Sequence, residues 1–250
     1  MRQRNVTSAL ACTIALTFTV PTAAFAYPDP LVLPSSRLQV GFGFGFAHRD
    51  PPSLTGIGFN VEAKYGLGGG AELGFRTAVR NTDGRATNAD IYARPADFQT
   101  FGTGNDTFAN PELRIRQAVT SALALEARAY VPFDGPFGFM LAAPLHLHGS
   151  SFQLESGVYV PLIFRSGSTE SWVSIPAQMW FAINAGSYIG LLSGARLANP
   201  GGDWSVPIGV GFDRTLSQSA DLVLWFLFPD VTQESAAKQF GGGAALRFRI

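Results

Sequence analysis

The chain of 250 residues has one cysteine, three histidines and only 14% charged residues. Cys12 lies in the first apolar stretch, so the remainder of the chain cannot form a disulfide or a thiolate metal site. Basic and acidic residues number 18 each, without the positive excess typical of proteins that bind nucleic acid. No apolar run of about 18 residues or more follows the N-terminus, which excludes a helical membrane protein.

The N-terminus has the pattern of a secretory signal peptide. Two arginines precede a short apolar stretch from Ala9 to Val20, and small residues follow at Ala24 and Ala26. The stretch is shorter than the roughly 20 residues that a spanning helix needs. We expect residues 1–26 to be a signal peptide, 27–36 a short periplasmic segment and 37–250 one domain. A lipoprotein signal at Cys12 is the weaker alternative.

Glycine and phenylalanine are abundant, with 28 and 21 residues, and in one segment they alternate at every second position. Residues 38–46 alternate large apolar side chains with Gln39, Gly41, Gly43 and Gly45. This alternation predicts a strand, but glycine on a water-facing side would weaken a soluble strand without a compensating gain. The pattern favours a strand whose apolar side contacts lipid and whose glycine side faces a crowded or ligand-lined interior.

The same alternation recurs and predicts twelve strands. Short turns follow the even-numbered strands, and the connections on the other side are longer on average, as in outer-membrane barrels. The longest connection, residues 81–110, is expected to be a large surface loop. The orientations of the eighth and eleventh strands stay open, because both are apolar on two faces. The predicted strands are 37–48, 56–66, 71–80, 111–119, 122–133, 137–148, 151–164, 171–183, 186–197, 203–213, 219–228 and 240–250.

These features resemble a Gram-negative outer-membrane β-barrel protein, porin-like or channel-like, over residues 37–250. The expected fold class is all-β, a closed antiparallel transmembrane β-barrel of about twelve strands. Members of this class end in an alternating strand with a terminal aromatic residue that the barrel-assembly machinery recognises. Residues 246–250 alternate in this way but end in Ile250. The resemblance implies a place in the outer membrane, contact with its lipid and lipopolysaccharide, and insertion by the assembly machinery.

Charged side chains concentrate on one face of the second to fifth predicted strands, which we interpret as the inner face. They suit either an ion-pair network that compensates buried charge or a polar strip that selects solutes in a pore. If the first charged hairpin is symmetric about Gly68, Lys64 faces Glu72. The predicted lumen-lining residues are Glu62, Lys64, Glu72, Arg76, Glu112, Arg114, Arg116, Glu126, Arg128, Glu155 and Arg247.

His146 and His148, followed by Ser150 and Ser151, raise the question of a hydrolase site on the barrel wall. These residues fall at an expected periplasmic turn, and no local Asp or Asn is available to orient the imidazole. Two histidines without a clustered third ligand also make a poor metal site. We therefore expect no enzyme activity, no catalytic residue, no metal and no cofactor.

Two further patterns concern the large and the small side chains. Tryptophans near strand ends, among them Trp172, Trp180 and Trp204, fit the aromatic girdles of a membrane barrel. Closure of the barrel requires the first strand to pair with the last, which sets the glycines of 41–45 beside residues 241–245. This seam of small residues leaves space in the lumen, either for a solute path or for bulky groups.

Three functions are compatible with these features. The leading hypothesis is a passive channel or transporter for small solutes, because a charged wall faces a glycine-rich and apolar wall. The alternative is a closed barrel that anchors or binds partners through residues 81–110. A lipid-modifying enzyme that uses His146 and His148 is a third. The sequence identifies no solute.

Overall fold

The computed structural model describes residues 30–50, 53–82, 85–87, 94–101, 111–131, 136–198 and 202–250. The predicted signal peptide and residues 27–29 lie outside the described residues. Within these ranges, no helix combines the length and the apolar character needed to cross a membrane.

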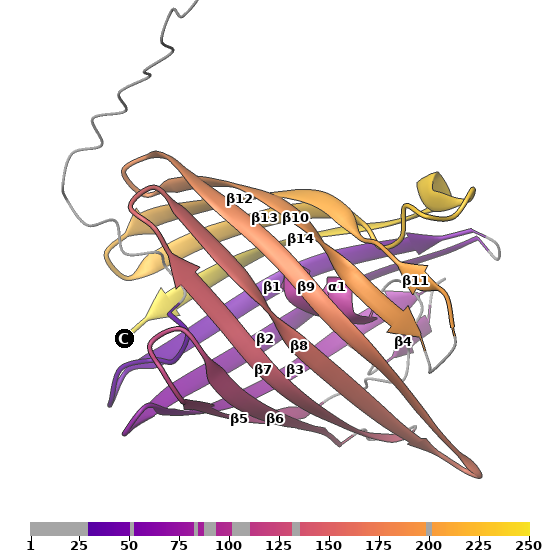
Figure 1. Cartoon of the computed structure of the whole chain (residues 1–250), viewed down its shortest axis with the longest axis horizontal. Coiled ribbons are helices and arrows are strands. Elements are labelled where there is room, and N and C mark those ends of the chain that lie inside the picture. Colours follow the sequence, from indigo (N-terminus) through magenta and orange to yellow (C-terminus); the bar gives the residue numbers. More distant parts are fainter. Residues whose placement is uncertain are drawn as a thin grey trace, which may run out of the picture.

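The described strands form one closed antiparallel barrel of twelve strands (Figure 1). Each barrel strand pairs with the next, and β1 (Leu38–Arg49) closes the barrel against β14 (Gln239–Arg249). The predicted fold class is confirmed. The other barrel strands are β2 (Leu54–Gly68), β3 (Ala71–Thr82), β5 (Glu112–Ala118), β6 (Ala124–Tyr130), β7 (Phe137–His148), β8 (Phe152–Arg165), β9 (Ser168–Asn184), β10 (Ser187–Ala198), β12 (Ile208–Ser217) and β13 (Ala220–Phe228).

In the described ranges, four short elements lie outside the barrel wall. Two are strands that pair with barrel strands, β4 (Arg85–Thr87) with β3 and β11 (Trp204–Ser205) with β10. The others are the 3-10 helix η1 (Ala236–Lys238) and the helix α1 (Pro95–Phe101). Figure 1 shows α1 inside the barrel.

The two faces of the strands differ as the alternation predicts. On β1, Phe42 and Phe44 are exposed, whereas the alternating Gly41, Gly43 and Gly45 are buried. The same outward apolar face continues around the barrel, with Phe59 on β2, Ile115 on β5 and Leu141 on β7 among its exposed residues. Such a band suits contact with hydrocarbon, and a closed barrel leaves no unpaired strand edge there.

The predicted pairing of the first and last strands is confirmed, although Gly41 lies opposite Arg247 and not beside residues 241–245. Gly45 lies opposite Gly243, and Gly43 lies opposite Ala245. In the β2–β3 hairpin, however, Lys64 lies opposite Gly74 and not opposite Glu72 as expected. A register shift between Gly66 and Gly68 displaces the centre of the hairpin, because the turn uses three consecutive glycines with positive φ.

The structure also orients β9 and β13, which the sequence left open. Trp180 of β9 and Trp225 of β13 both face the lumen, 1% and 5% exposed, while Phe181 and Leu224 face outward. Trp172 also lies inside, where its Nε1 donates a hydrogen bond to the carbonyl of Thr100. The girdle assignment of Trp172 and Trp180 is therefore wrong, because each side chain completes an apolar interior.

A charged residue on the outward face tests whether this face is embedded in lipid. Phe59 is 65% exposed on β2, and Phe59→Arg should lower the free energy of unfolding from vesicles by about 2 to 4 kcal/mol, because a guanidinium in hydrocarbon is costly. Urea titration of vesicle-inserted protein, followed by tryptophan fluorescence, measures the change. Ser53→Arg, at an exposed turn, is the matched control and should have little effect. Equal effects of the two variants would contradict a lipid-facing β2.

Candidate functional site in the barrel lumen

α1 occupies the lumen. Its residues Asp97, Phe98 and Gln99 are 1% to 2% exposed, and the helix contacts β9, β10, β13 and β14. The expectation that residues 81–110 form a surface loop is therefore wrong for 94–101. Residues 83–84, 88–93 and 102–110 lie outside the described residues. Pro95 at the first helical position and Asp97 in the first turn are ordinary helix-start signals that the sequence did contain.

The lumen has two chemically different walls. The inner face of β2, β3, β5 and β6 carries charged residues, whereas β7, β8, β9, β10 and β13 supply most of a buried apolar cluster. Asp213 of β12 and Asp221 of β13 are buried charges on this second side. α1 matches both walls, because Asp97 faces the first and Phe98 and Phe101 belong to the apolar cluster of the second. The apolar wall includes Met140, Ile163, Trp180, Leu192, Val223, Trp225 and Leu227.

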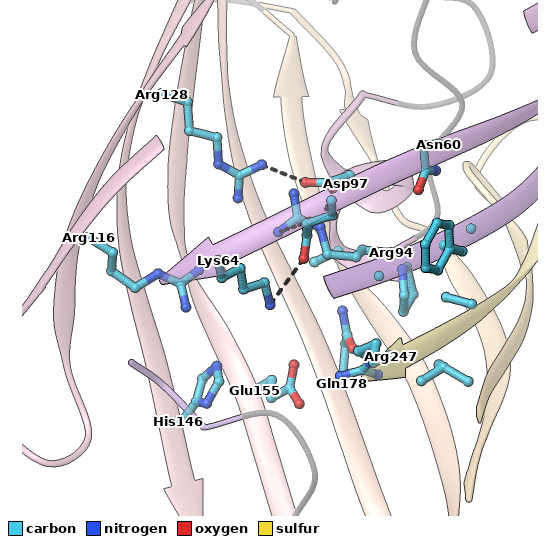
Figure 2. A pocket seen from close by; sticks show the side chains of 18 of the residues that line it. Asn60, Lys64, Arg94, Asp97, Arg116, Arg128, His146, Glu155, Gln178 and Arg247 are labelled. Carbon is cyan, nitrogen blue, oxygen red and sulfur yellow. Dashed lines mark hydrogen bonds and ion pairs between the residues drawn. The ribbon is translucent and has the colours of Figure 1, made fainter. Parts of the chain in front are cut away.

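The carboxylate of Asp97 lies among three guanidinium groups. Its Oδ2 accepts hydrogen bonds from Arg76 Nη1 at 2.6 Å and from Arg94 Nε at 2.8 Å. Its Oδ1 accepts one from Arg128 Nη1 at 2.8 Å. Arg76 belongs to β3 and Arg128 to β6, so the two oxygens bridge different strands of the charged wall. Figure 2 shows Arg128 directed toward Asp97.

The same arginines also pair with carboxylates of the wall itself. Arg76 Nη2 lies 2.6 Å from Glu112, and Arg128 Nε lies 2.5 Å from Glu126. Arg116 shares Glu126. These buried charges compensate one another, and removing one partner of such a pair costs about 3 to 5 kcal/mol because the other stays buried without compensation.

The structure places the predicted lumen-lining residues on the inside of the barrel. Arg114 and Glu72 form an ion pair of 3.1 Å, and Lys64 pairs with Glu62 at 3.2 Å. Gly74 leaves the room that the Arg114 guanidinium occupies, since a Cβ there would lie 2.9 Å from its Nε. The remaining members of the predicted set are Glu155, which lines the cavity beside α1, and Arg247, which pairs with Asp213.

On the opposite side, the inner glycines accommodate aromatic rings. A Cβ at Gly241 would collide with the ring of Phe98, and one at Gly243 would lie 2.6 Å from Trp225 Nε1. The rings of Phe98 and Trp225 pack with their centroids 5.2 Å apart. The seam of small residues is thus filled by bulky groups, which come from α1 and from the neighbouring strand β13.

Gln99 anchors the third side of α1. Its Nε2 donates hydrogen bonds to the carbonyl oxygens of Ser193 on β10 and Ala177 on β9. Its Oε1 accepts a hydrogen bond of 3.0 Å from Gln178 Nε2. Together with Asp97 and Phe98, Gln99 ties α1 to strands on every side of the lumen. Sequence reasoning missed these three residues, because their partners are distant in the chain.

The N-terminal segment, residues 30–36, contacts the other end of the same ion-pair network. Leu31 and Leu33 are buried, and the backbone N–H of Leu33 donates to Glu72 Oε2 at 3.0 Å. The carbonyl of Leu31 accepts a hydrogen bond from Arg116 Nη1. Ser36 bonds to the backbone of Gly66, beside the β2–β3 turn. The segment therefore packs into the barrel end that carries the short turns.

A cavity of about 80 Å³ remains beside α1. Figure 2 shows Lys64 and Arg116 around it, with His146 and Glu155 close together at one side. His146 is buried and lies opposite Glu155 in the β7–β8 register, whereas His148 is exposed. The two histidines thus do not share one environment. In the described part of the chain, no three His, Cys, Asp or Glu residues form a group suited to a metal ion.

No protein family model and no curated protein matches the sequence. Solved structures do resemble the fold. An outer-membrane channel from Pseudomonas putida F1 superposes with a TM-score of 0.54 at 10% identity, covering 90% of this chain and 99% of that one. The NanC porin gives a TM-score of 0.54 at 6% identity, with 84% and 98% covered.

A third structure has a similar arrangement of strands. The translocator domain of the autotransporter NalP from Neisseria meningitidis gives a TM-score of 0.51 at 8% identity, covering 86% of this chain and 88% of that one. The shared feature of these neighbours is the barrel and not the sequence. The chain thus has the fold of the β-barrels found in outer-membrane porins and channels.

Proposed function

We propose that the protein is an outer-membrane channel for small solutes, and that α1 is its gate. The observation that carries this proposal is how α1 is held. The barrel strands are joined by a continuous backbone ladder, whereas α1 is anchored through side-chain contacts. These are the contacts of Asp97, Phe98 and Gln99 and the hydrogen bond from Trp172 to the carbonyl of Thr100. A helix held in this way can leave the lumen without breaking the wall.

The outer-membrane location is part of the same proposal. It is supported by the apolar outward face, by the fold shared with porins and channels, and by the signal-peptide pattern of residues 1–26. Departure of α1 would uncover charged side chains of β2, β3, β5 and β6 on one side of the lumen and aromatic side chains on the other. Charged groups that line a pore select among solutes.

A second candidate is a closed barrel with an anchoring role. The filling of the glycine seam by Phe98 and Trp225 favours it, because a lumen packed in this way also stiffens the wall. The two candidates differ in the effect of releasing α1. A gated channel then conducts ions, whereas a structural barrel loses stability without gaining conductance.

Neutralising Asp97 should open the channel. Asp97→Asn removes the charge that Arg76, Arg94 and Arg128 bind, so α1 should leave the lumen more often. We expect the mean ionic current in planar bilayers to rise about tenfold or more, which corresponds to about 1.4 kcal/mol.

The matched control for Asp97→Asn breaks an exposed ion pair. Glu170→Gln removes the partner of Arg165, in a pair whose side chains are both 44% exposed. Such pairs contribute little, so the current should not change. An Asp97→Asn barrel that is folded but carries no more current than Glu170→Gln would contradict the gate.

A small addition to the glycine wall should have a similar effect. Gly241→Ala places a methyl group against the Phe98 ring, so either the ring or α1 must move. We expect a higher open probability in single-channel recordings. Gly41→Ala is the control on the same inner wall, because its Cβ would meet Glu62 Cβ at an ordinary 3.7 Å. Identical recordings from the two variants would show that the contact between Phe98 and Gly241 does not hold α1 in the lumen.

A further inference from the structure

We propose that the lumen site filled by α1 binds small aromatic carboxylates, and that Asp97 and Phe98 occupy it as an internal substitute for such a solute. This inference rests on the proposed channel function and names the class of solute. Two adjacent residues of α1 present a carboxylate and a phenyl ring, and each group meets a complementary part of the wall. The position of α1 thus indicates which chemistry the lumen recognises.

The carboxylate half of the site belongs to the wall. Arg76 and Arg128 bind different oxygens of Asp97, and both are strand residues that stay in place when α1 moves. The described inward charges of β2, β3, β5 and β6 have a positive excess of one, since five cationic groups face four carboxylates. The cationic groups are Lys64, Arg76, Arg114, Arg116 and Arg128, and the carboxylates are Glu62, Glu72, Glu112 and Glu126.

The two arginines are oriented before any solute arrives. Glu112 holds Arg76, and Glu126 holds Arg128, at 2.6 Å and 2.5 Å. Guanidinium groups fixed in this way lose little side-chain entropy on binding a carboxylate. Their planar geometry also favours a carboxylate over a cation or a neutral hydroxyl.

The aromatic half lies across the lumen. Phe98 fits against Gly241, where a side chain would collide with the ring, and packs at 5.2 Å from Trp225 with a tilt of 51°. Tilted aromatic pairs at this separation are favourable beyond their buried area. A solute with both an aromatic ring and a carboxylate can replace both contacts, whereas acetate or an aromatic amine can replace only one.

Calorimetry on the folded barrel tests the ligand class. The double variant Asp97→Asn, Phe98→Ala removes the carboxylate charge from one half of the site and the ring from the other, and 3-phenylpropanoate is the probe. We expect it to bind at least about tenfold more tightly than acetate, which lacks the ring, or phenethylamine, which has the opposite charge. Binding of all three with equal affinity, or of none, would overturn the proposal.

Two additional substitutions in that background separate the halves of the site. Arg128→Gln removes one carboxylate contact, and Gly241→Leu fills the ring position without changing any charge. Each should weaken 3-phenylpropanoate binding about tenfold, with heat-modifiable migration in SDS gels as the check on folding. If Arg128→Gln does not fold, Gly241→Leu decides alone, and unchanged affinity in Gly241→Leu would overturn the site.

The channel itself is tested by a separate readout. Planar-bilayer current through the same double variant reports whether the lumen conducts when α1 is released. Absence of current would overturn the proposed channel function, while calorimetry still decides the ligand class. Current that is blocked by 3-phenylpropanoate, and not by phenethylamine at the same concentration, would support both.

Discussion

The lumen depends on one buried carboxylate. Asp97 joins arginines of β3 and β6, two strands of the charged wall that are separated only by β5. It does so from a helix that contributes nothing to the barrel wall. Buried guanidinium groups need nearby negative charge, and Glu112 and Glu126 supply the rest of it. The position of α1 follows from this requirement, because it brings the acid between those strands while the phenylalanines of the helix reach the apolar wall.

The same packing in the lumen explains the inward-facing glycines. In a barrel of this size the interior is narrow, so aromatic rings fit inside where nearby strands lack inward side chains. Gly241 makes room for Phe98 and Gly243 for Trp225, while Gly190 and Gly211 lie beneath the ring of Trp180. Strands that look apolar on both faces therefore have one apolar face directed outward and one that packs against aromatic rings in the lumen.

The two ends of the lumen are coupled through the charged wall. The N-terminal segment binds Glu72 and Arg116, and α1 binds Arg76 and Arg128 of the same ion-pair network. A rearrangement at one end therefore changes the electrostatic surroundings of the other. In the proposed channel, α1 rather than the barrel wall would then control the space inside.

The barrel can be predicted from the amino-acid sequence: the twelve strands, their alternation and the glycine seam reflect local periodicity, because successive strand residues face opposite sides. The inward charges are visible for the same reason. The contents of the lumen, in contrast, depend on long-range packing, which brings α1 inside, turns Trp180 inward and matches each arginine with its carboxylate. Gln99 reaches carbonyls 78 and 94 residues away, and a short helix has no periodicity that could indicate such partners. A two-residue alternation distinguishes the two faces of a strand, but it does not indicate which side chains fill the lumen.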